Sequence, residues 1–115
     1  MKYALLVYND TEIHGALTDE ERERIRSDVA EQLARPKIGP WVRLREVDSA
    51  TTVRYEDGKA LLTDGPFVDS KEYLGGLIMV EAANLDEALA AAGEFQAALA
   101  GHSGAIEVRP ILDAE

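Results

Sequence analysis

Apolar residues are distributed along the chain with a period of two in some segments, and this period predicts β-strands. Lys2–Tyr8 is apolar at every position after the lysine, and Leu74–Ala82 is almost as apolar, so both are expected to be strands covered on both faces. Pro40–Val47 alternates apolar and charged side chains, which predicts a strand with one face in water. Ala105–Leu112 is expected to be the last strand.

A β-hairpin is predicted in the middle of the sequence. Thr51–Glu56 and Lys59–Thr63 both have strand-like composition, and they flank the dipeptide Asp57-Gly58. Because Asp-Gly tolerates the left-handed backbone of a two-residue turn, these two segments should pair with each other.

Two segments have helical periodicity and recognisable start signals. Thr18–Glu21 has the pattern of a capping box, and the helix it opens should end at Pro36. Asn84–Glu87 offers a second capping box, and Gly101 is placed to end that helix. The predicted apolar stripes are Ile25, Val29 and Leu33 in the first helix, and Leu85, Ala88, Leu89, Ala92, Phe95 and Leu99 in the second.

The order of these elements predicts one α+β domain that spans residues 1–115. It fits a ferredoxin-like antiparallel sheet with two helices on one face. Two strands are apolar on both sides, yet no further element is left to cover the second face of the sheet. We therefore expect a second copy to pack there, giving a homodimer with a cavity between the two sheets.

Composition limits the kinds of partner that we expect and indicates the cellular compartment. The chain of 115 residues has 22 acidic and 12 basic residues and a net charge of −10, which argues against nucleic acid or an anionic membrane as partner. It contains no cysteine, and the apolar run at its start is too short for a signal peptide or a membrane span. We expect a cytoplasmic protein with no metal and no cofactor.

The segment Thr63–Phe67 (TDGPF), followed by Lys71–Gly76 (KEYLGG), resembles the signature of the DGPF, or YCII-related, family. Supporting landmarks lie along nearly the whole chain: Met1–Tyr8, Thr51–Arg54, Leu85–Ala88 and Glu107–Pro110. The resemblance implies a dimeric ferredoxin-like α/β barrel. It also implies a possible link to sigma factors, because many members are encoded beside them.

Relatives of the YCII type are suspected enzymes with a His and an Asp in the cleft, the His on or near the first helix. This sequence departs from that pattern because residues 19–35 contain no histidine. The segment Ile38–Leu44 departs as well, since Trp41 and Arg43 stand where members have a glycine-rich stretch.

Two residues are candidates for acid/base catalysis. Asp64 can close an Asx turn on its own backbone, or it can point into the cavity as a proton acceptor. The chain has two histidines, His14 and His102, and neither has a second ligand at the spacing of a metal site. His14 is the better candidate for a general base, because the loop that carries it can reach the cavity rim; the alternative is an ordinary surface histidine.

Five further residues are candidates for ligand binding: Tyr8, Arg54, Phe67, Lys71 and Glu72. One of the tyrosines at positions 3 and 8 should pack under the helices while the other faces the cavity, and Arg54 could clamp a carboxylate or pair with a neighbouring acid. Phe67 is expected to anchor its turn in the core. Lys71 or Glu72 could hold a charged ligand at the cleft mouth, or both could simply be solvated.

Three functions remain open on the sequence. The first is the binding of a small molecule between the two sheets of the homodimer. The second is a small enzyme that uses acid/base chemistry on a compact polar or aromatic substrate. The third is a protein-interaction module, associated with a sigma factor, whose acidic surface docks a basic partner.

Overall fold

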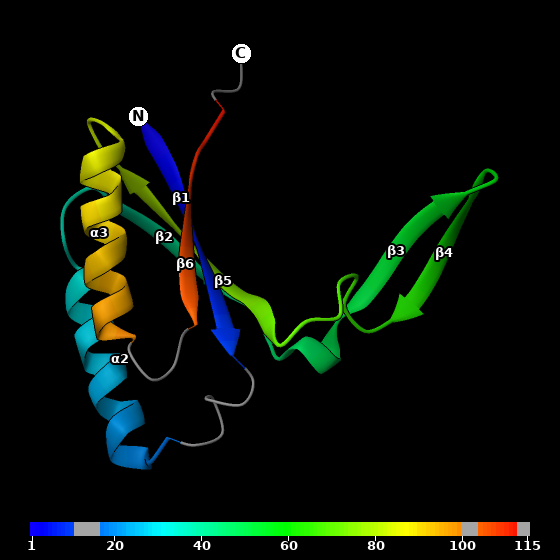
Figure 1. The fold of residues 1–115 in the computed structure, drawn as a ribbon, viewed down its shortest axis with the longest axis horizontal. Helices are drawn as coiled ribbons and strands as arrows, with labels where there is room; N and C mark the ends of the chain where they lie inside the picture. Colours follow the sequence, from blue (N-terminus) through cyan, green and yellow to red (C-terminus); the bar gives the residue numbers. More distant parts are fainter. Residues whose placement is uncertain (11–16, 100–103, 113–115) are drawn as a thin grey trace.

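The computed structural model of the chain describes residues 1–10, 17–99 and 104–112. Within these ranges, four strands form an antiparallel sheet in the order β2-β5-β1-β6 (Figure 1). The central strands are β1 (Lys2–Asp10) and β5 (Glu72–Glu81), and the outer strands are β2 (Ile38–Arg43) and β6 (Ala105–Pro110). The two strands predicted to be apolar on both faces are thus the two central ones.

Both helices, α2 (Asp19–Leu33) and α3 (Leu85–Ala98), lie on the same side of this sheet (Figure 1). Together with the four strands they alternate as βαββαβ, the order of the ferredoxin-like motif. The predicted α+β class and the placement of both helices on one face are confirmed.

The core lies between the helices and the face of the sheet that they cover. Tyr3, Leu5 and Val7 of β1 are buried there, so Tyr3 is the tyrosine that packs under the helices and Tyr8 lies on the opposite face. The other buried apolar residues are Ile25, Val29, Ile78, Val80, Ala82, Ala88, Ala92, Phe95 and Leu99. Leu85 and Leu89 of the predicted stripe of α3 are instead each 47 % exposed, because the small residues Ala88 and Ala92 make the close contact.

Capping residues fix where both helices begin. In α2, the Glu21 backbone amide donates to Thr18 Oγ1 (3.1 Å) and the Glu21 carboxylate accepts from the Thr18 amide (3.4 Å), so the predicted capping box is confirmed. In α3, Asn84 Oδ1 accepts from the Glu87 amide (3.0 Å).

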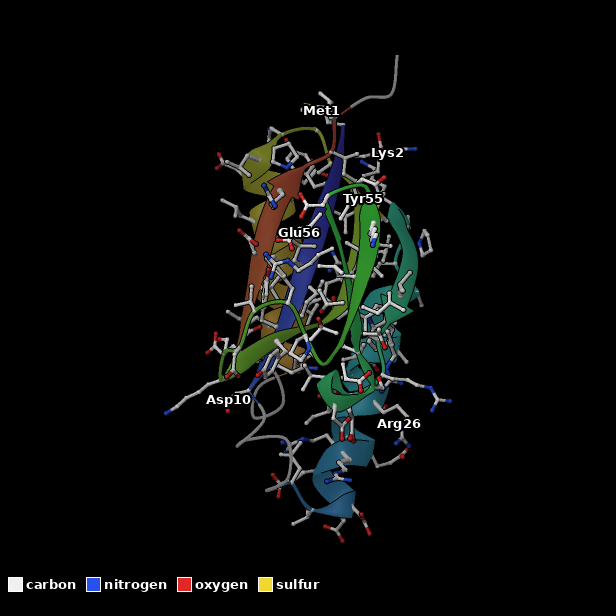
Figure 2. The ribbon with its side chains drawn as sticks, turned by 90° about the vertical axis from the view of Figure 1, so that its right-hand side faces the viewer. Met1, Lys2, Asp10, Arg26, Tyr55 and Glu56 are labelled. Atoms are coloured by element: carbon white, nitrogen blue, oxygen red, sulfur yellow. The ribbon has the colours of Figure 1, made fainter. Side chains whose placement is uncertain are left out.

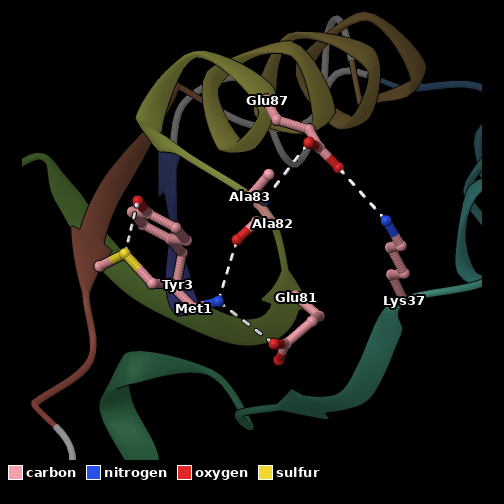
Figure 3. Close-up of polar contacts among 7 residues, drawn as sticks. All are labelled: Met1, Tyr3, Lys37, Glu81, Ala82, Ala83 and Glu87. Atoms are coloured by element: carbon pink, nitrogen blue, oxygen red, sulfur yellow. Dashed lines mark hydrogen bonds and ion pairs between the residues drawn. The ribbon is translucent and has the colours of Figure 1, made fainter.

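The second capping box is only half formed. The Glu87 carboxylate accepts from the amide of Ala83, one residue before the cap, and it lies 3.7 Å from Lys37 Nζ (Figure 3). Glu87 therefore ties the start of α3 to the turn that leads into β2. Gly101, predicted to end this helix, lies outside the described residues.

Strand β2 ends four residues before the predicted strand does. The Leu44 amide makes the last ladder bond, to the Gly75 carbonyl (2.9 Å), and the chain then leaves the sheet. A 3₁₀ turn at Val47–Ser49 follows. Residues Leu44–Glu46, which the period-two pattern assigns to a strand, form the loop before that turn, so the alternation of apolar and charged residues did not mark a strand here.

The predicted hairpin is confirmed. Strands β3 (Thr51–Glu56) and β4 (Lys59–Asp64) pair around Asp57 and Gly58, which have positive φ values of 50° and 76°. They form a sheet of their own, which projects from the uncovered side of the main sheet (Figure 1). Figure 2 shows the hairpin standing in front of that uncovered face.

The projecting hairpin makes the chain extended. The radius of gyration is 16.0 Å, whereas a compact domain of this length has about 13 Å. The face of the main sheet turned toward the hairpin carries Leu6, Leu77 and Met79, which are only half-buried. The single chain thus leaves both an apolar sheet face and a hairpin without cover from its other described residues.

Candidate functional site

An open groove of about 780 Å³ lies where the uncovered face of the sheet meets the base of the hairpin. Three segments form its walls: the ends of β1 and β5, the loop that follows β2, and the link from β4 to β5. Its lining residues are Tyr8, Leu44, Arg45, Glu46, Val47, Ser49, Ala50, Pro66, Val68, Ser70, Glu72, Tyr73 and Leu74.

A β-bulge shapes the floor of the groove. Val7 pairs with Gly76 and Tyr8 with Leu74, so Gly75 is the extra residue on β5. A Cβ atom at Gly75 would meet the side-chain amide of Asn9, which would have to move to make room for it. Because of the bulge, Tyr8 and Leu74 lie opposite each other at the point where the two central strands enter the groove.

The loop after β2 is held as one wall by its own hydrogen bonds. The Ser49 amide and hydroxyl both donate to the carbonyl of Glu46, at 3.0 and 2.6 Å, and the Ala50 amide donates to the Val47 carbonyl (3.1 Å). These bonds close the 3₁₀ turn and fix the backbone around Arg45 and Glu46.

The link between β4 and β5 forms the opposite wall. The Tyr73 hydroxyl donates to Asp69 Oδ1 (3.0 Å) and accepts from the Ser70 amide (3.2 Å), while the Glu72 amide donates to Ser70 Oγ (3.2 Å). Tyr73 thereby organises the link from within the strand that follows it. This role explains why a tyrosine stands beside the KEYLGG glycines.

The groove combines apolar walls with a few polar groups. Leu44, Val68 and Leu74 are 50, 61 and 42 % exposed, which leaves apolar wall open to solvent. Two carboxylates, Glu46 and Glu72, outnumber the one guanidinium, that of Arg45. An apolar surface with a small number of fixed polar groups is the usual character of a small-molecule site.

The Tyr8 hydroxyl is one of these polar groups. It donates to Glu107 Oε1 on the neighbouring strand β6, at 3.4 Å. The ring lies on the uncovered face, as one alternative of the sequence prediction held for this tyrosine. Tyr8 and Glu107 therefore link the groove to the outer strand of the sheet.

Of the predicted site residues, the structure brings Tyr8 and Glu72 together in the groove. Asp64 ends β4 with its side chain exposed, Lys71 is exposed, and neither lines the groove. Arg54 lies 3.9 Å from Glu56, so it pairs with a neighbouring acid. His14 and His102 lie outside the described residues, so acid/base catalysis stays a prediction.

The expected role of Phe67 is wrong. Its side chain is 73 % exposed, and its ring lies 5.9 Å from the Arg54 guanidinium carbon, so it packs on the hairpin instead of anchoring in the core. The turn is fixed by two hydrogen bonds at Gly65. Its amide donates to the Ala50 carbonyl oxygen (2.7 Å), and its carbonyl oxygen accepts from Thr52 Oγ1 (2.7 Å).

Sequence reasoning missed several groove residues, of which Arg45, Glu46, Ser49 and Ser70 are the polar ones outside the two motif segments, while Tyr73 lies inside KEYLGG without having been given a role. The first three were assigned to a strand or to the space before the hairpin. One signal was present: Asp48-Ser49 is a common turn-forming pair and argues against a continuous strand there.

Within the described ranges, no cluster of three or more His, Cys, Asp or Glu side chains could hold a metal ion. A search of the same residues for a helix with the length and apolar character needed to cross a membrane finds none.

Comparison with known proteins agrees with the sequence landmarks. The model of the YCII-related domain matches residues 1–115. An uncharacterized protein of Rhizobium meliloti (strain 1021) is 37 % identical over 115 residues, which cover 96 % of this chain and 92 % of that protein. The chain therefore belongs to the YCII-related family.

Proposed function

We propose that the protein is a homodimer that binds a small molecule in a cavity between two facing sheets, with the groove as each chain's part of that cavity. The observation that carries this proposal is the position of the groove. It lies at the end of an apolar sheet face that no described element of the chain covers.

Burial supports a second copy as the cover of this face. Leu6, Leu77 and Met79 are half-buried and Val42 is 49 % exposed, although all four belong to the sheet. Covering such a surface removes apolar area from water, at about 25 cal/mol per Å². A two-fold dimer covers both copies of the face in one contact.

The groove also indicates which kinds of ligand to test. Its apolar walls and two tyrosine rings suit a compact aromatic group, and its two carboxylates against one guanidinium favour a neutral or cationic substituent over an anionic one. The net charge of −10 also favours a neutral or cationic ligand over an anionic one.

The test is a saturation-transfer NMR titration of the protein with phenol, benzylamine and benzoate. We expect signals from benzylamine and phenol, and a much weaker one from benzoate. Leu74→Trp should strongly weaken them, because a larger side chain at this 42 % exposed position occupies the floor of the groove. Leu89→Trp is the matched control, since it enlarges a leucine of similar exposure on α3, away from the groove.

Binding that survives Leu74→Trp, in a protein whose thermal unfolding matches that of the control, would place the site elsewhere. If none of the three probes binds to the unmodified protein at millimolar concentration, the small-molecule proposal fails.

A further inference from the structure

The hairpin of residues 51–64, called the arm below, has one apolar and one polar face. Opposed residues across its two strands point to the same side. The apolar face carries Val53 with Leu62 and Tyr55 with Ala60, and at its base the polar pair Thr51 with Asp64. The other face carries the pairs Arg54 with Leu61, Glu56 with Lys59 and Thr52 with Thr63. This alternation is typical of a strand pair with one face packed and one in water.

The apolar face of the arm is not packed on anything in the described chain. Val53 is 64 % exposed, Tyr55 is 75 % exposed and Leu62 is 71 % exposed. Leu61, on the polar face, is the least exposed of the arm's large apolar residues, at 42 %. An isolated two-stranded hairpin is marginally stable in water at best, so the arm is expected to pack against another surface.

The arm is held too far out to cover its own groove. At its base the Gly65 amide bonds to the Ala50 carbonyl, and the Arg54 guanidinium packs on Phe67. From this base the strands run out for six residues each, about 20 Å, and the arm stands clear of the sheet (Figure 1). Its apolar face is therefore positioned to contact another molecule.

A second copy of this chain is the occupant that the surfaces favour. The chain exposes a second apolar surface, the groove walls at Leu44, Val68 and Leu74, on the side of the sheet from which the arm projects. In a two-fold dimer, the apolar face of each arm meets the groove walls of the other copy. The symmetric pair of contacts then covers all four apolar surfaces. A different protein would have to supply both complementary surfaces itself.

We propose that the two copies exchange arms, and that the apolar face of each arm covers the groove of the partner subunit. Tyr55, the one aromatic residue of the arm, then becomes part of the partner subunit's binding cavity. This inference rests on the proposed dimer and adds that each ligand site is built from both chains.

The first test compares two aspartate substitutions at adjacent residues of the arm. Leu62→Asp puts a charge on the apolar face, where it would be buried without a partner, and should raise the dimer dissociation constant at least about 100-fold. Leu61→Asp is the matched control, because it puts the same charge on the polar face opposite Arg54 and should change that constant less than about threefold. Light scattering over a concentration series gives both values.

The second test removes the arm. Residues 51–64 are replaced by two glycines, a short connection that suits the close approach of Ala50 and Gly65. Urea unfolding checks that the remaining sheet and helices still unfold cooperatively. The armless chain should then be a monomer and should lose benzylamine and phenol binding.

The third test locates the contact. Because the chain has no cysteine, a Tyr55→Cys chain mixed with a Leu44→Cys chain can form only engineered disulfides. We expect a mixed disulfide between the two chains, and none when Glu56→Cys, on the polar face, replaces Tyr55→Cys. Equal disulfide yields from positions 55 and 56 would contradict the proposal that the apolar face of the arm contacts the groove of the partner subunit.

The outcomes separate this inference from the proposed dimer. A dimer that persists without the arm, or with Leu62→Asp, overturns arm exchange and leaves the sheet-to-sheet dimer standing. An unmodified chain that is a monomer at a concentration of about 100 μM overturns both.

Discussion

At the scale of single residues, the glycines of β5 control how closely the strands approach. A Cβ atom at Gly76 would lie 2.9 Å from the Val42 carbonyl oxygen and 3.2 Å from Trp41 Nε1. The indole and the edge strand β2 therefore occupy space that any other residue at position 76 would need. Trp41 is in turn stacked under the Arg43 guanidinium, whose carbon lies 5.2 Å from the ring centroid.

Gly76→Ala should consequently destabilise the protein by about 1–3 kcal/mol, since backbone atoms of β2 would have to move. Gly93→Ala is a matched control with the opposite sign. Gly93 lies within α3 with nothing within 4 Å of its added Cβ, so the alanine should stabilise by about 1 kcal/mol. Urea unfolding measures both changes, and a neutral Gly76→Ala would show that β2 is free to shift.

At the scale of elements, start signals in the sequence are reliable and end signals are less so. Thr18 illustrates the first point, because its hydroxyl and the Glu21 carboxylate satisfy amides that the helix itself cannot. The end of β2 illustrates the second, because its last ladder bond, from the Leu44 amide, is made to Gly75, on a strand that lies far away in the sequence.

Thr18→Ala should lower the free energy of unfolding by about 1 kcal/mol, because the Glu21 amide loses its acceptor. Ser27→Ala, at an exposed interior position of the same helix, removes a hydroxyl that caps nothing and should be neutral or slightly stabilising. Chemical denaturation of the two variants gives the comparison. Equal losses would mean that the hydroxyl of Thr18 does not act as a cap.

The helices, the central strands and the hairpin could be predicted from local periodicity, caps and the Asp-Gly turn. The groove could not, because its walls are loops whose positions depend on long-range contacts such as that between Leu44 and Gly75. Phe67 shows the same limit, since its hydrophobicity predicted burial while the chain at that point runs along the base of the arm. Tyr8 was found because it belongs to a strand that could be assigned, and Glu72 because it lies in the KEYLGG motif next to the predicted strand.

At the scale of the whole molecule, the proposed dimer would make stability depend on association. The sheet face and the arm gain their cover from a second copy in our proposal, so dissociation and unfolding are linked. The melting temperature should therefore rise when the protein concentration is raised a hundredfold, as it does for a dimer that unfolds to separate monomers. Calorimetry at several concentrations measures this, and a constant melting temperature would contradict the linkage.

The uncovered arm also bears on how a newly made chain finds its partner. Each of its strands has one edge with unpaired amide and carbonyl groups, and such edges recruit any extended peptide they meet. The surplus negative charge slows these encounters between copies, productive and unproductive alike. In the proposed dimer, cellular abundance would therefore be a determinant of folding yield, because a scarce chain would wait longer with its arm exposed.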